Sequence, residues 1–168
     1  DKVLPRTTTI AAGIGLVYLS LTLLCFVFLV IAGMDMFNGI AHAMTIVATG
    51  GFSTKNMSIG HFDSLKIEMI TMFFMIISSL PFLLLFQSLK GKISDLFKNS
   101  QVQFFFFIIL ILTLIITLWL QKFYEVNFFQ ALRISSFSVI SITTGSGFST
   151  YDFSVWGSFT TIILLFFM

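Results

Sequence analysis

Gly51-Phe52-Ser53-Thr54 occurs a second time as Gly147-Phe148-Ser149-Thr150, 96 residues further along the chain. Each copy follows a short apolar stretch, Phe37–Thr49 before the first and Phe128–Thr144 before the second. Glycine and hydroxyl residues that directly follow an apolar stretch of this length indicate a short helix ending in a loop. The repeated tetrapeptide therefore predicts two matched helix–loop units.

The same offset of 96 relates polar residues inside the two short stretches. It maps His42 and Thr45 onto Ser138 and Ser141. The members of each pair are three residues apart, so they lie on one face of a helix. We predict a polar stripe in the C-terminal half of each short helix, beside its loop.

Long apolar runs surround both units. Ile10–Met34 contains no charged residue and would extend about 37 Å as a helix, enough to cross a bilayer with some tilt. We predict further spans at Met69–Phe86, at Phe104–Leu120 and from Val155 onward, with a kink at Pro81. The fold class is an all-α membrane protein in which the order long helix, short helix, loop, long helix occurs twice.

The composition agrees with a lipid environment. Hydrophobic residues make up 57% of the chain and charged residues 10%, and the mean hydropathy is +1.04. The net charge of +2 and the lack of a basic, aromatic-rich patch argue against nucleic-acid binding. Cys25 is the single cysteine and lies in an apolar run, so we expect a buried or lipid-facing residue and no disulfide or metal cluster. The sequence contains nothing that resembles a nucleophile–base pair or a nucleotide-binding loop, so we do not expect an enzyme.

The chain divides into a first unit at residues 1–87, a polar linker at 88–103 and a second unit at 104–168. Counting charges, the tail and linker carry about +3 and the loop side about −1. The positive-inside rule then places the tail and linker in the cytoplasm and both loops toward the outside.

A loop at membrane depth must line a water-filled path or pack on protein, because its unpaired backbone groups would be costly in lipid. Stacked backbone carbonyls can replace the water around a potassium ion. Such a backbone needs residues that tolerate unusual dihedral angles, and we expect this of Gly50, Gly51, Gly145 and Gly147. No carboxylate lies within either stretch, which favours a monovalent cation over Ca²⁺.

Three alternatives remain open from the residues alone. The loops are ordinary extramembrane turns, or they belong to another re-entrant-loop transporter, for a neutral or anionic solute, for Na⁺, or for a cation coupled to Na⁺ or H⁺. In the third alternative the chain is an assembly subunit that transports nothing.

Both loop regions resemble the TrkH family of bacterial potassium-uptake subunits, which is grouped with the KtrB and HKT proteins. The first resemblance is carried by Ala43–Thr54, Ser58–Gly60 and Phe62–Ser64. The second is carried by Ala131–Arg133, Phe137, Val139–Ile142, Gly147-Phe148, Asp152-Phe153 and Trp156.

The resemblance implies four pore-loop repeats around one pore, of which this chain is an internal fragment covering repeats two and three. Members of the family usually have Thr-Thr-Thr-Gly in the third loop, whereas this chain has Thr144-Gly145-Ser146-Gly147. The implied K⁺-binding filter backbone comprises Thr49, Gly50, Gly51, Phe52, Gly145, Ser146, Gly147 and Phe148.

The resemblance also implies where the protein acts and with what. It implies potassium uptake across the bacterial plasma membrane, a homodimer, and a cytosolic partner, TrkA, with nucleotide-binding RCK domains. K⁺ is the transported ion, and no cofactor is expected in this chain. The linker lysines between Lys90 and Lys98 lie on the side of that partner, although topology alone accounts for their charge.

Four other polar residues require an explanation. Arg133 either positions the second short helix, by pairing with Glu125 or another outer acid, or extends to the membrane interface. We expect His42 to be a packed histidine with satisfied hydrogen bonds rather than a proton carrier. His61 and Asp63 are expected to face the outer solvent.

Overall fold

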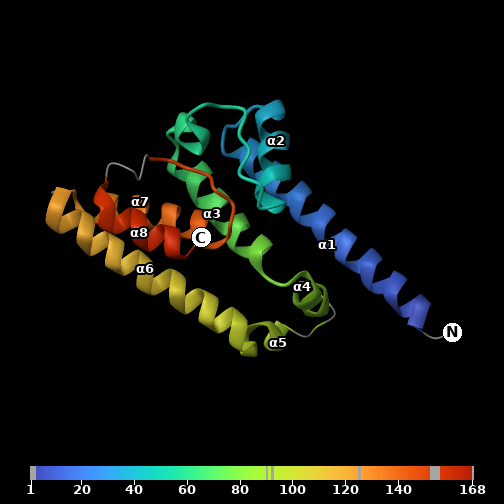
Figure 1. The fold of residues 1–168 in the computed structure, drawn as a ribbon. Coiled ribbons are helices and arrows are strands. Elements are labelled where there is room, and N and C mark those ends of the chain that lie inside the picture. Colours follow the sequence, from blue (N-terminus) through green and yellow to red (C-terminus); the bar gives the residue numbers. More distant parts are fainter. Residues whose placement is uncertain (1–2, 90, 92, 125, 152–155, 168) are drawn as a thin grey trace.

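The computed structural model describes residues 3–89, 91, 93–124, 126–151 and 156–167. In that part of the chain every element of regular secondary structure is a helix (Figure 1). The elements are α1 (Val3–Ile31), α2 (Met36–Val47), the 3₁₀ helix η1 (Ser58–Phe62), α3 (Leu65–Ser79), α4 (Phe82–Leu89), α5 (Ile93–Lys98), α6 (Ser100–Tyr124), α7 (Phe128–Thr143) and α8 (Gly157–Phe166).

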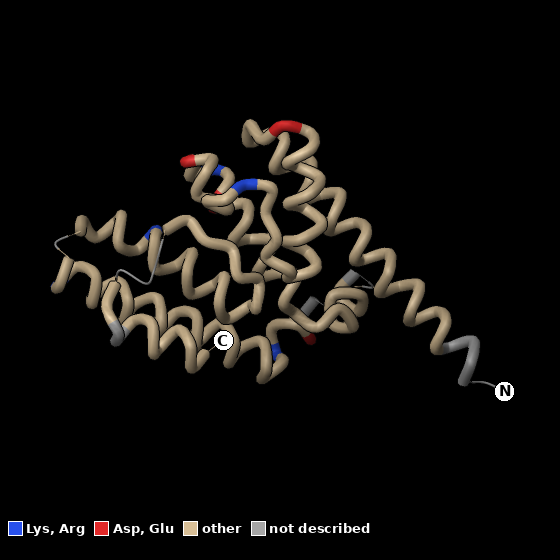
Figure 2. Tube along the Cα trace, turned by 45° about the horizontal axis from the view of Figure 1, so that its top comes forward, with Lys and Arg blue, Asp and Glu red and all other residues tan. Residues whose placement is uncertain are grey.

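Two of the described helices are long and apolar enough to cross a membrane by themselves, α1 from Thr7 to Ile31 and α6 from Ser100 to Tyr124. Both predicted spans are therefore confirmed. Charged residues lie mainly near helix ends and in the connecting segments, and the middles of the long helices carry none (Figure 2). Many phenylalanines and leucines on these helices are exposed, as a lipid-facing surface requires.

The predicted span Met69–Phe86 is not one kinked helix, because α3 and α4 meet at an angle of 98°. Leu80 is extended, with φ −73° and ψ 150°, and Pro81 follows it. A proline excludes the helical conformation from the residue before it and lacks the N–H for the next helical bond, so the helix ends there. The kink was predicted correctly, but its size makes this segment a break between two helices.

Each short helix packs on the long helix before it, α2 on α1 and α7 on α6, while α3 contacts both α2 and α7. Asp35 caps α2 by accepting a hydrogen bond from the N–H of Asn38 at 3.2 Å. The short helices end at Val47 and Thr143, 96 residues apart, as the repeated tetrapeptide predicts.

The helices that follow the loops break this register, since α3 begins at Leu65 and α8 at Gly157. Their starts are only 92 residues apart, because the longer first connection contains η1. The sequence predicts only a loop after the first short helix, and the 3₁₀ helix from Ser58 to Phe62 corrects that prediction. The linker likewise contains a helix, α5, while Lys90 and Lys92 lie outside the described residues.

Candidate functional site

The first loop runs back along α2, so that successive loop residues bond to successively earlier residues of the helix. The Thr45 hydroxyl donates to the Phe52 carbonyl at 2.9 Å, and the Ser53 hydroxyl bonds His42 Nε2 at 2.8 Å. The Thr54 hydroxyl then donates to the side-chain carbonyl of Asn38. Asn38, His42 and Thr45 thus form one polar stripe that anchors the loop along two turns of α2. His42 and Thr45 are the two residues predicted for this stripe, and Asn38, four residues before His42, extends it.

His42 is completely buried, and its hydrogen bonds define its protonation. Nδ1 lies 2.8 Å from the Asn38 carbonyl, which can only accept, so Nδ1 carries the proton and Nε2 accepts from Ser53. Burial is the main cause that lowers the pKa of this imidazole, which favours its neutral form. The ring stacks on Phe148 of the second loop and meets Phe62 edge-on. The prediction of a packed and satisfied histidine is confirmed.

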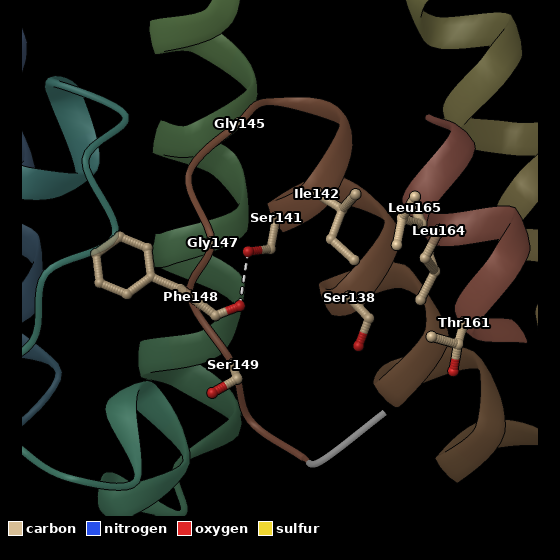
Figure 3. A pocket seen from close by; sticks show the side chains of 10 residues that line it. All are labelled: Ser138, Ser141, Ile142, Gly145, Gly147, Phe148, Ser149, Thr161, Leu164 and Leu165. Atoms are coloured by element: carbon tan, nitrogen blue, oxygen red, sulfur yellow. Dashed lines mark hydrogen bonds between the residues drawn. The ribbon is translucent and has the colours of Figure 1, made fainter. Parts of the chain in front are cut away.

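The second loop repeats the Thr45–Phe52 bond and the backbone turn of the first loop at the α7 end. The Ser141 hydroxyl donates to the Phe148 carbonyl at 2.6 Å (Figure 3), the exact counterpart of Thr45 and Phe52 at the offset of 96. The backbone also corresponds, because Gly50 N–H donates to the Thr45 carbonyl at 2.8 Å and Ser146 N–H to the Ser141 carbonyl at 2.9 Å. The two loops therefore share this carbonyl anchor and this backbone turn.

The left-handed positions of the loops differ in part from those expected. Gly51, Gly145 and Gly147 have φ of 67°, 72° and 75°, as predicted, but Gly50 does not have a positive φ. The left-handed residue next to it is Thr49, with φ of 50°, and its counterpart at the offset of 96 is Gly145. Glycine adopts this conformation without the strain that a side chain brings. The unusual Gly145 therefore relaxes a strained position and retains the backbone path.

The two loops contact each other directly. A Cβ added to Gly51 would lie 1.9 Å from the Ser146 carbonyl oxygen, so only glycine fits there. Further along, the Gly60 N–H donates to the Ser149 carbonyl at 3.2 Å, and the Ser149 N–H donates to the Ser58 hydroxyl at 3.3 Å. We call these five residues, Gly51, Ser58, Gly60, Ser146 and Ser149, the inter-loop seam.

The carbonyl groups of the eight candidate residues fall into two sets. Those of Phe52 and Phe148 are held by hydroxyl groups of α2 and α7. The other six accept no hydrogen bond from the described part of the chain. They belong to Thr49, Gly50, Gly51, Gly145, Ser146 and Gly147. They form two runs of three; Ser146 is buried, and the other five residues are half-buried or exposed. These carbonyls are therefore free to bind a ligand other than this chain.

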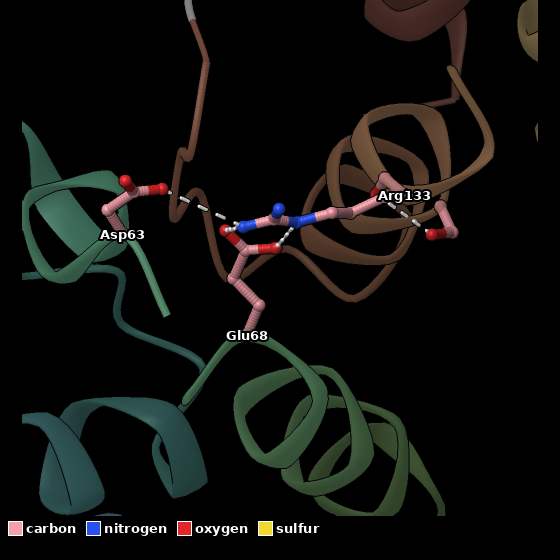
Figure 4. A network of polar contacts seen from close by, with 4 residues as sticks. Asp63, Glu68 and Arg133 are labelled. Carbon is pink, nitrogen blue, oxygen red and sulfur yellow. Dashed lines mark hydrogen bonds and ion pairs between the residues drawn. The ribbon is translucent and has the colours of Figure 1, made fainter. Parts of the chain in front are cut away.

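Arg133 at the start of α7 joins the two units through Glu68 (Figure 4). Its Nε and Nη2 donate to the two Glu68 carboxylate oxygens at 2.7 and 2.8 Å, and Glu68 is only 2% exposed. The hydrogen bond that the guanidinium donates to Glu68 is the largest cause that raises its pKa. Asp63 lies 4.0 Å from Arg133, and its side chain is 92% exposed.

This pair decides between the two hypotheses for Arg133 in favour of helix positioning. Glu125, the acid considered first, lies outside the described residues, and the partner that the structure gives Arg133 is another loop-side acid, Glu68. The sequence offered no reason to select Glu68 over its acidic neighbours, because the partners are 65 residues apart. The exposure expected of His61 and Asp63 is confirmed.

A cavity of about 360 Å³ lies beside the second loop (Figure 3). It is lined by Ser138 and Ser141 of α7, by the loop, and by Thr161, Leu164 and Leu165 of α8. The described residues contain no group of three or more His, Cys, Asp or Glu side chains arranged for a metal ion. The loops thus offer neutral oxygen atoms rather than a carboxylate site.

Apolar spans, a broken helix pair and two short helices that end in loops define an all-helical membrane protein. Residues 1–168 match the TrkH family model, described as a cation transport protein, and the chain belongs to this family of transporters rather than enzymes.

The relatives agree with this assignment. The chain is 38% identical to the Trk system potassium uptake protein TrkH of Halomonas elongata, over 93% of this chain and 33% of that protein. It is 34% identical to the Escherichia coli K12 protein of the same name, over 98% and 35%. The crystal structure of the potassium transporter TrkH from Vibrio parahaemolyticus superimposes with a TM-score of 0.89 at 35% identity, covering 96% of this chain and 36% of that one. The chain thus spans about a third of these proteins.

Proposed function

We propose that the full-length protein takes up potassium across the bacterial plasma membrane, and that the two loops form two of the four walls of its selectivity filter. The observation that carries this proposal is the set of six unpaired carbonyls, three in each of the two loops. Desolvating K⁺ requires oxygen ligands that replace its water, and neutral carbonyls supply them without trapping the ion by charge.

The short helices support the same role. The polar stripe of α2 and the Ser141 hydroxyl of α7 bind the Phe52 and Phe148 carbonyls, so each loop is held at its outer end. The C-terminal ends of α2 and α7 precede the unpaired carbonyls, and the negative end of a helix dipole stabilises a nearby cation. In this proposal Phe52 and Phe148 position the loop, while residues 49–51 and 145–147 face the ion.

The proposal extends to the arrangement of the whole protein. Residues 1–87 are one pore-loop repeat, 88–103 a cytoplasmic linker and 104–168 the first part of another, with both loops facing outward. Phe148 is 3% exposed and stacks on His42, whereas Phe52 is 77% exposed, as expected if the repeat before it supplies the missing neighbour. We also propose a homodimer with a cytosolic RCK partner of the TrkA type.

Ion flux from liposomes tests this function. The purified full-length protein, reconstituted without other proteins, is expected to release trapped K⁺ down its gradient faster than Na⁺. A carrier of neutral or anionic solutes would leave the K⁺ gradient intact, and that result would overturn the proposal. Single cysteines placed from Thr49 to Thr54, with Gly51 left unchanged, give a second reading, because a pore lining reacts with a small charged thiol reagent and a buried scaffold does not.

A further inference from the structure

The Glu68–Arg133 pair connects the helices that border the inter-loop seam. Glu68 lies in the first turn of α3, directly after η1, whose Ser58 and Gly60 bond to Ser149 of the second loop. Arg133 lies on α7, eight residues before Ser141, which holds the Phe148 carbonyl. Eight residues of helix are about 12 Å of stiff structure, so movement of Arg133 is transmitted to the second loop.

Burying this ion pair has a desolvation cost, so stabilisation alone does not explain why the two positions carry charged residues. Glu68 is 2% exposed, and an arginine–carboxylate pair removed from water regains its desolvation cost only with good geometry. The bidentate geometry here is good, and Glu68 gains further from the positive N-terminal end of α3. Apolar residues at both positions would join the helices as firmly but would not specify one relative position, because dispersion contacts are not directional.

The position that the pair specifies is that of the two loops. Gly51 faces the Ser146 carbonyl so closely that a methyl group has no room between them. A small displacement of α7 relative to α3 therefore changes the separation of carbonyls on the two sides of this contact. The spacing of its oxygen ligands is one of the properties by which a filter distinguishes K⁺ from Na⁺.

We propose that Glu68 and Arg133 are positioning residues that set the spacing between the two pore loops and thereby the preference for K⁺ over Na⁺. The proposal rests on the function proposed above. Asp63 has a minor part, since a contact of 4.0 Å to an exposed carboxylate is weak. Neither Glu68 nor Arg133 touches the ion.

The test uses the full-length protein in liposomes and compares the rates of K⁺ and Na⁺ release. The informative variants are Glu68→Gln, Arg133→Gln, the double variant E68Q/R133Q, and Arg133→Lys. Arg133→Lys keeps the charge but gives up the two-pronged bond. The matched control is Lys66→Gln, which removes an exposed charge from the same turn of α3. Membrane abundance is measured for every variant.

We expect Arg133→Lys to lower the K⁺/Na⁺ rate ratio about tenfold, which corresponds to a coupling of about 1.4 kcal/mol. Each single neutral variant leaves one charge without its partner and should also lower abundance, Arg133→Gln more so because Glu68 is buried. In E68Q/R133Q no unpaired charge remains, so abundance should return while the rate ratio stays low. Lys66→Gln should match the wild type in both readings.

Recovery of both abundance and the K⁺/Na⁺ ratio in E68Q/R133Q would overturn the inference and leave the pair a purely structural link. An unchanged ratio in Arg133→Lys would contradict it as well. A wild-type protein that releases no K⁺ at all is a different outcome, because it refutes the proposed function itself.

Discussion

Gly51→Ala is expected to reduce K⁺ flux through the full-length protein by about 100-fold, the loss typical of a reacting group misplaced by about 1 Å. The new Cβ would lie 1.9 Å from the Ser146 carbonyl oxygen, whereas real Cβ contacts stay at 3.0 Å or more. The two loops must therefore separate by at least 1.1 Å at this point. Both sides of the contact are backbone, so no flexible side chain can absorb the displacement.

Conformational strain adds a second effect that must be separated from the first. Gly51 has φ of 67°, and a side chain in the left-handed region costs about 1–2 kcal/mol. Gly33 isolates this strain, because its φ is 107° and a Cβ there would meet nothing within 4 Å. Gly33 lies between α1 and α2, away from both loops, so Gly33→Ala should lower stability and leave flux per molecule unchanged.

The assay is growth of K⁺-uptake-deficient cells at low K⁺, followed by K⁺ flux in liposomes normalised to protein amount. Gly51→Ala should fail in both, and Gly33→Ala should support growth. Equal flux per molecule in Gly51→Ala and wild type, with an unchanged K⁺/Na⁺ ratio, would refute the placement of Gly51 at a tight contact within the filter.

Three further predictions concern the contacts around the loops. Thr45→Val and Ser141→Ala each remove a hydroxyl that holds a loop carbonyl, so each should lower thermal stability by about 1 kcal/mol and reduce K⁺/Na⁺ discrimination. Thr45→Ser keeps the hydroxyl and should therefore keep the K⁺/Na⁺ discrimination. Burial lowers the pKa of His42, so the contribution of its neutral form to stability is complete above about pH 6.5 and is lost as the pH falls below that value. The melting temperature should therefore decrease more between pH 7.5 and 5 in wild type than in His42→Gln. Equal decreases in the two proteins would contradict this. Thr117→Val breaks a buried hydrogen bond of 2.6 Å to Ser135 between α6 and α7, and should lower stability by about 1 kcal/mol without changing ion preference.

Much of the helical architecture could be predicted from local patterns. The repeated tetrapeptide located both loops, and the polar pairs led by His42 and Ser138 identified the helix face beside each loop. Pro81 predicted the interruption of the second span, because its chemistry acts on its immediate neighbours. The angle of 98° could not be predicted, since it depends on how α3 and α4 pack against other helices.

The contacts between the two loops and between their helices could not be predicted either, because they too depend on tertiary packing. Nothing local distinguishes Glu68 from Asp63, yet only the first is buried against Arg133. The assignment of unusual backbone angles to Gly50 was wrong because glycine permits such angles without requiring them. Thr49 adopts one because the first loop follows the path that Gly145 follows in the second.

The central claim is that unpaired carbonyls of the two loops bind the transported ion. Its most direct test is a structure of the full-length protein in Rb⁺, with the ions located by their anomalous scattering. We expect Rb⁺ peaks bounded by carbonyls of residues 49–51 and 145–147. Peaks located elsewhere in the membrane region, with these carbonyls bonded to protein, would contradict it.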